Sequence, residues 1–192
     1  MVLIIGAYNV PFQLSIGPLI GAIAAGCTAV LKPSEAASNS AMIMERLVKD
    51  VLDPQCHVVV NGGILEASAL DEKWDKIFYT GSAAAGTIIA KKAAATLTPV
   101  WLELGGRNPA FVTKNANARL AARRLLWGKA MNAGQICLSH NYALVDKVIL
   151  LAFVQEMEKA VKEFWPGGVR ESEDYGRFRA VACGAHDGSE YS

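Results

Sequence analysis

The first 31 residues, MVLIIGAYNVPFQLSIGPLIGAIAAGCTAVL, decide the fold of this 192-residue chain. They contain no charged side chain, and Asn9, Pro11 and Gly26 interrupt the apolar run. Long apolar segments of this kind are typical of a parallel sheet that is covered on both faces. We therefore interpret the stretch as a strand, a buried helix and a second strand. A membrane span or signal peptide is the disfavoured alternative, because no lysine or arginine precedes the apolar run.

The same alternation continues through the first hundred residues. β-branched runs predict strands at residues 2–5, 28–31, 57–60, 77–79 and 100–102, and the stretches between them predict helices at residues 14–25, 38–51, 65–70 and 83–95. This order of elements indicates an α/β fold with a doubly wound parallel sheet. The loops that follow the strands then share one sheet edge, where ligands of such sheets bind.

The pattern of short strands and alanine-rich helices changes after residue 104. A strand is predicted within residues 105–112, and a helix at 116–133, a strand at 142–145 and a helix at 150–164 follow. From residue 178 onward the periodicity is lost, and we expect an unstructured tail. The predicted domains are therefore residues 1–104 and residues 105–177, with the tail at residues 178–192.

Composition excludes several classes of function. The balance of 19 Lys+Arg against 18 Asp+Glu gives a net charge of +1, so no bulk field attracts nucleic acid or an anionic membrane. A hydrophobic fraction of 52% and a mean hydropathy of +0.24 exclude disorder over most of the chain. The four cysteines form no C-x-x-C pair, so we expect neither a metal site nor a disulfide framework. Small molecules or other protein chains are the expected partners.

Two residues could carry chemistry. Cys137 lies in NAGQICLS (132–139) after a predicted helix, and it is either a nucleophile or a buried, inert thiol. Glu103 is the only carboxylate in the apolar segment 100–104, at the end of a predicted core strand. Burial would favour a general base there, whereas an ion pair or a carboxylate that reaches solvent are the alternatives.

Two loops could bind a nucleotide. FYTGSAAAG (78–86) places Gly81 and Gly86 around a helix start that follows a strand, which suits a phosphate but also a simple turn of small residues. LKPSE (31–35) places Lys32 and Glu35 after the second predicted strand. Its alternative is a solvated helix start that Ser34 caps.

These segments, in this order, resemble motifs of the aldehyde dehydrogenase superfamily. The matching segments are GAYNVPF (6–12), LKPSE, FYTGSAAAG, LELGG (102–106) and NAGQICLS. The chain looks closest to the class that includes fatty and aromatic aldehyde dehydrogenases. The resemblance implies a Rossmann-like NAD-binding domain followed by the first part of an α/β catalytic domain, with the family's sequence incomplete at both ends.

The resemblance also implies roles for three chemical residues. Cys137 matches the nucleophile that attacks the aldehyde carbon, and Asn9 matches the asparagine that holds the resulting oxyanion. Glu103 matches the base that activates water, which favours a hydrolytic enzyme over the CoA-acylating branch. The implied reaction oxidises an aldehyde to a carboxylic acid through a thiohemiacetal and a thioester.

The implied cofactor is NAD, with NADP left open because the resembling class includes members that use both. Lys32 and Glu35 match contacts to the adenosine ribose, and the carboxylate of Glu35 would repel a 2'-phosphate. Gly63 matches the adenine side. The positions that match the pyrophosphate turn and helix start are Gly81, Ser82 and Gly86.

Family members are more than twice this length, so we expect a truncated chain that is weakly active or inactive alone. The alternative function is a non-catalytic, NAD-binding or dimerising fragment that modulates a full-length relative. A small-molecule aldehyde is the expected substrate, and an oligomer with itself or with such a relative stays open. Cytoplasm is the default location, because no targeting signal is visible.

Overall fold

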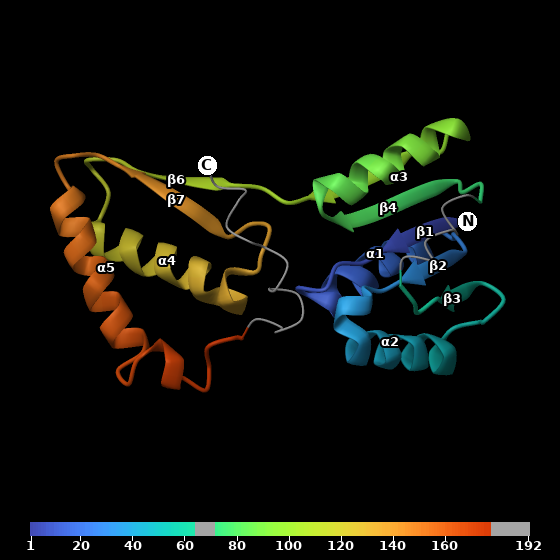
Figure 1. Ribbon diagram of the computed structural model, residues 1–192, viewed down its shortest axis with the longest axis horizontal. Coiled ribbons are helices and arrows are strands. Elements are labelled where there is room, and N and C mark those ends of the chain that lie inside the picture. Colours follow the sequence, from blue (N-terminus) through green and yellow to red (C-terminus); the bar gives the residue numbers. More distant parts are fainter. Residues whose placement is uncertain (64–71, 178–192) are drawn as a thin grey trace. The chain divides into compact units, whose positions relative to one another are not determined.

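The computed structural model describes residues 1–63 and 72–177. The helix predicted at residues 65–70 and the tail at 178–192 lie outside the described residues. The chain divides into two compact units, and the division falls between Gly105 and Gly106. Each unit has a hydrophobic core of its own and is described by itself (Figure 1).

The first unit is built on a five-stranded parallel sheet with the strand order β3-β2-β1-β4-β5. Its strands are β1 (Val2–Ile5), β2 (Ala29–Lys32), β3 (His57–Val59), β4 (Lys76–Gly81) and β5 (Val100–Leu104). The chain adds β2 and β3 on one side of β1, then crosses back and adds β4 and β5 on the other. This arrangement confirms the predicted doubly wound sheet and places its switch point between β1 and β4.

Three helices cover the two faces of this sheet, because side chains alternate along each strand. Leu3 and Ile77 share a core with Ile89 of α3 (Ala83–Ala95). The opposite face packs Ile4 against α1 (Pro11–Ala24) and α2 (Ser38–Val51). Thus α1 and α2 lie on one face and α3 lies on the other (Figure 1). Among the residues that the structure describes, no helix is both long and apolar enough to cross a membrane.

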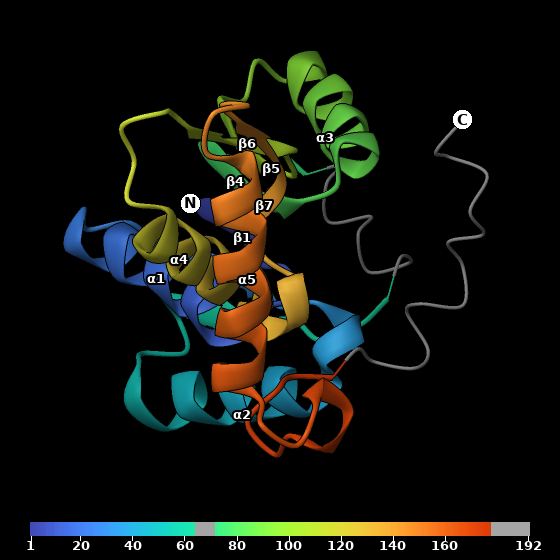
Figure 2. The same ribbon diagram turned by 90° about the vertical axis from the view of Figure 1, so that its left-hand side faces the viewer.

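The second unit begins with the parallel strand pair β6 (Asn108–Val112) and β7 (His140–Val145). Helices α4 (Ala118–Ala130) and α5 (Leu150–Phe164) pack against each other (Figure 2). Val112 of β6, Ala122 of α4 and Phe153 of α5 form the buried core of this unit. The other face of the strand pair is open: Phe111 is 73% exposed and Leu144 is 51% exposed.

The prediction of a long helix at residues 116–133 is wrong at its C-terminal end. The helix α4 stops at Ala130, and a short turn, Met131–Gly134, follows it. Three consecutive residues in this turn, Asn132, Ala133 and Gly134, have φ angles of 52°, 54° and 78°. The left-handed region costs about 1–2 kcal/mol for a residue with a side chain, so the surrounding structure must hold this turn. Helical periodicity could not reveal it, because the side chains up to Ala133 also suit a helix.

Candidate active site

Two loops flank the switch point of the first sheet, where open α/β sheets bind ligands. The loop between β1 and α1 carries Asn9, which is half-buried. The backbone N–H of Gly6, where this loop begins, donates to the carbonyl of Lys32 at 3.0 Å. The turn between β4 and α3 carries Gly81 and Ser82. Because β1 and β4 are neighbours in the sheet, the Asn9 loop and the Ser82 turn follow adjacent strands.

The start of α3 is shaped by close backbone packing. The Ser82 hydroxyl caps the helix by accepting a hydrogen bond from the Ala85 N–H at 3.3 Å, and the Tyr79 hydroxyl donates to the Ser82 carbonyl at 3.2 Å. A Cβ at Gly81 would lie 2.6 Å from Cζ of Tyr79, so only glycine fits there without a shift of the ring. No acidic residue stands in the first turn of α3. The positive end of the helix is therefore available to a phosphate.

Lys32 links the LKPSE segment (31–35) to the segment that contains Gly63. Its side chain is only 11% exposed. Its ammonium donates to the Glu35 carboxylate and to the Gly62 carbonyl, both at 3.2 Å, and to the Pro33 carbonyl at 3.4 Å. The structure thus brings Lys32 and Glu35 together and places them beside the segment that contains Gly63. The Glu35 side chain is 55% exposed, so a ligand hydroxyl can reach its carboxylate.

The charge of Glu35 is set by opposing effects. Partial burial raises the pKa of this carboxyl, but hydrogen bonds from its own backbone N–H and from Lys32, together with the Lys32 charge, lower the pKa more, so it lies below 4.5. Glu35 is therefore ionised at neutral pH. An ionised carboxylate accepts hydrogen bonds from ribose hydroxyls and repels an added phosphate.

The environment of Glu103 differs from the predicted one. The strand β5 is the last in the order β3-β2-β1-β4-β5, so within the described residues it is an edge strand and not a core strand. Glu103 is exposed and accepts a hydrogen bond from Trp101 Nε1 at 2.7 Å. The expectation of a buried carboxylate is therefore not met, and the alternative of a side chain that reaches solvent describes Glu103.

Cys137 lies in the second unit, in a turn before β7. It is exposed, so the alternative of a buried thiol does not hold. Its carbonyl accepts a hydrogen bond from Asn108 Nδ2 at 2.6 Å, and the same amide donates to the Ser139 carbonyl at 2.9 Å. Sequence reasoning missed Asn108, because one polar residue in a short strand carries no pattern. Of the other cysteines, Cys27 and Cys56 are partly buried and free, and Cys183 lies outside the described residues.

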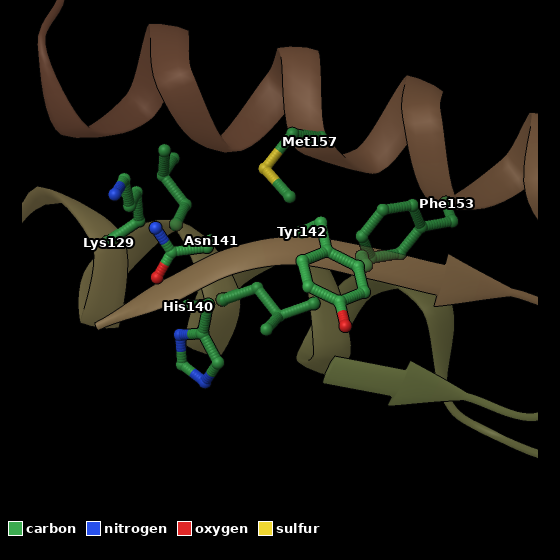
Figure 3. Close-up of a pocket in the computed structure, with 9 residues that line it drawn as sticks. Lys129, His140, Asn141, Tyr142, Phe153 and Met157 are labelled. Carbon is green, nitrogen blue, oxygen red and sulfur yellow. The ribbon is translucent and has the colours of Figure 1, made fainter. Parts of the chain in front are cut away.

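The second unit also has a shallow, mostly apolar hollow of about 190 Å³ between α4, β7 and α5. Phe153 and Met157 extend toward it from α5, and Lys129, His140 and Asn141 supply polar groups (Figure 3). None of these side chains is among the sequence-predicted site residues. Within the described part of the chain, no group of His, Cys, Asp or Glu side chains could hold a metal ion.

The chain matches the aldehyde dehydrogenase family over residues 1–177 and belongs to that family. It is 59% identical to beta-apo-4'-carotenal oxygenase of Neurospora crassa over 92% of this chain and 33% of the relative. It is 46% identical to a dimeric, NADP-preferring aldehyde dehydrogenase of Canis lupus familiaris, over 92% of this chain and 39% of the relative.

A solved structure of the AldH protein of Staphylococcus aureus, in a substrate-bound state, superposes with a TM-score of 0.89. The two chains are 40% identical over 92% of this chain and 39% of that one. The present chain thus spans 33% to 39% of the length of these relatives.

Proposed function

We propose that this chain contributes to the oxidation of an aldehyde to a carboxylic acid with a nicotinamide dinucleotide. The observation that carries the proposal is the exposed Cys137 thiol in a hydrogen-bonded turn, in a chain that also contains a doubly wound sheet. In the overall reaction, an aldehyde, an oxidised dinucleotide and water yield a carboxylic acid, a reduced dinucleotide and a proton.

The first unit supplies groups that suit a dinucleotide. The ionised Glu35 carboxylate would accept hydrogen bonds from the adenosine ribose, with Lys32 fixing its position, and Gly63 would lie on the adenine side. The start of α3, with Gly81, Ser82 and Gly86, would receive the pyrophosphate. When bound, the dinucleotide accepts the hydride that leaves the substrate carbon. Glu35 favours NAD, although the relative from Canis lupus familiaris prefers NADP.

The thiol chemistry falls to Cys137 and Asn9. The Cys137 thiolate attacks the aldehyde carbon, and the carbonyl oxygen becomes the oxyanion of a thiohemiacetal. The Asn9 side-chain amide and the backbone N–H of Cys137 donate hydrogen bonds to that oxyanion. Hydride loss from the same carbon then leaves a thioester on Cys137.

Hydrolysis of the thioester falls to Glu103. Its exposed carboxylate takes a proton from a water molecule, which attacks the thioester carbon and releases the carboxylic acid and the Cys137 thiolate. The support for this role is the match of LELGG (102–106) to the family's motif, and the exposure of Glu103 leaves its carboxylate open to water.

The test is a rapid-mixing assay of aldehyde-dependent NADH formation by the purified chain. Cys137→Ser should abolish NADH formation altogether. Glu103→Gln should retain a single burst of NADH and lose steady turnover, because only the hydrolysis step needs the base. Cys56→Ser is the matched control and should behave as the parent.

NADH formation that survives Cys137→Ser would contradict the proposed nucleophile. A folded parent chain that binds NAD without forming NADH would instead support a non-catalytic, dinucleotide-binding function.

A further inference from the structure

An irregularity in strand pairing lies next to the Cys137 turn. Asn108 pairs with His140 and Pro109 pairs with Tyr142, so Asn141 is an extra residue in β7. Such β-bulges bend a strand and redirect a side chain, and they are frequent beside functional sites. The extra residue also contacts the partner strand, because Asn141 Oδ1 accepts a hydrogen bond from the Asn108 backbone N–H at 3.4 Å.

The side chain of Asn108, on the strand that faces this bulge, binds the turn that carries Cys137. Its amide nitrogen has two hydrogens, and the carbonyls of Cys137 at 2.6 Å and Ser139 at 2.9 Å accept one hydrogen bond each. The turn closes on itself through the Ser139 N–H, which donates to the Ile136 carbonyl at 2.9 Å. Ser139 is 3% exposed, whereas Cys137 is exposed. One amide therefore anchors a compact turn at its buried end and leaves the thiol at its open end.

The segment just before this turn needs such an anchor. Asn132, Ala133 and Gly134 all have left-handed φ angles, a conformation that persists only where neighbouring contacts hold it. Gly176 packs against the left-handed residues, where an added Cβ would lie 3.3 Å from the Ala133 nitrogen. Asn108 holds the chain on the downstream side, at residues 137 and 139.

We infer that Asn108 is the positioning residue of the Cys137 thiol. This inference rests on the proposed role of Cys137 as the nucleophile. Asn108 acts through the backbone: it fixes the carbonyls of Cys137 and of Ser139, two residues further on, and thereby fixes the direction in which the thiol approaches an aldehyde carbon. Such a group contributes to rate by maintaining geometry.

The test compares Asn108→Asp with its matched control Asn141→Asp. Asn108→Asp replaces the donating amide by a carboxylate that repels both carbonyls, whereas an aspartate at 141 still accepts from the Asn108 N–H. Both are made in a chain with Cys27, Cys56 and Cys183 changed to serine, so that Cys137 is the sole thiol. Hydrogen exchange of peptides covering residues 136–140 and the rate of Cys137 alkylation by iodoacetamide are measured from about pH 6 to about pH 9.

Asn108→Asp should accelerate exchange at residues 136–140 by about tenfold and change the alkylation rate by about threefold or more, with α5 unaffected. Asn141→Asp should leave both within about twofold of the parent. Asn108→Ala, which removes the donor without adding charge, should reproduce the first pattern.

Parent-like exchange and alkylation in Asn108→Asp and Asn108→Ala would overturn the inference. Equal acceleration throughout α4 and α5 in both would also overturn it, because Asn108 would then support the whole second unit. Neither measurement uses a dinucleotide or an aldehyde, so failure here is distinct from failure of the proposed reaction.

Discussion

Glu103 is an exposed carboxylate that accepts a hydrogen bond from Trp101. Because a glutamine oxygen can accept the same bond, we expect Glu103→Gln to change the free energy of unfolding by less than about 0.5 kcal/mol. Urea unfolding followed by circular dichroism measures this change. A loss of more than about 3 kcal/mol would indicate a buried, paired charge and contradict the observed exposure.

Glu35 gives a pH dependence of stability with a definite sign. Its pKa is lowered in the folded chain, so its contribution is complete above about 4.5, the ordinary value, and disappears as the pH falls through the folded pKa. The stability difference between the parent and Glu35→Gln should therefore be constant from neutral pH down to about 4.5 and disappear as the pH falls through the lower, folded pKa of Glu35. The difference should stay under about 1 kcal/mol, because the pair is partly exposed. A difference that grows in acid would mean that burial raises this pKa.

Helices α2, α3 and α5 and strand β1 match the sequence prediction at both ends, while several other elements differ from it at one end or both. In α3 the first helical residue follows the capping Ser82, and α5 presents a regular apolar face to α4. The helix predicted at residues 14–25 instead begins at Pro11, because proline suits the first position of a helix. Capping residues and apolar periodicity thus predict the ends of a helix where local sequence sets them. They fail where contacts with distant parts of the chain set the end, as in the turn at Ala133.

Two glycines near the start of α3 make a contrast: Gly81 ends β4, and Gly86 lies in the first turns of the helix. Ala at position 86 would crowd Cδ2 of Leu104, at 2.8 Å, and make an ordinary contact with the Tyr79 ring, at 3.5 Å. The Leu104 side chain is partly exposed and can move. The gain in helix propensity of about 1 kcal/mol then offsets the crowding. Ala at position 81 would displace the buried Tyr79 ring and its hydrogen bond to Ser82.

We therefore expect Gly81→Ala to destabilise the chain by about 1–3 kcal/mol and Gly86→Ala to stay within about 1 kcal/mol of the parent. Thermal and urea unfolding of the two variants, side by side, check this order. The reverse order would show that Leu104 is held more rigidly than Tyr79.

The second unit leaves apolar side chains exposed on the open face of its strand pair. Phe111 is 73% exposed and is paired in register with Leu144, which is 51% exposed. Exposed apolar patches promote association, so we expect Phe111→Glu with Leu144→Glu to reduce self-association in sedimentation velocity. Leu120→Glu, an exposed position on α4, serves as the control. Equal association of all three chains would exclude this face as the cause.

Much of the candidate site could be predicted because parallel strands place their following loops at one edge. That rule locates Asn9, Lys32 and Ser82 from sequence alone. It could not reveal the exposure of Glu103, which depends on the position of β5 at the sheet edge. It also could not reveal Asn108, because its hydrogen bonds to the Cys137 turn form only when β6 pairs with β7.

The most direct test of the account is calorimetric titration of the folded chain with NAD and with NADP. We expect saturable, one-site binding of NAD that weakens about tenfold or more in Glu35→Ala, and weaker binding of NADP by the parent. Asp50→Ala, an exposed carboxylate on α2, is the control and should bind as the parent does. A chain with the circular dichroism of a folded α/β protein and no saturable heat with either dinucleotide would contradict the account.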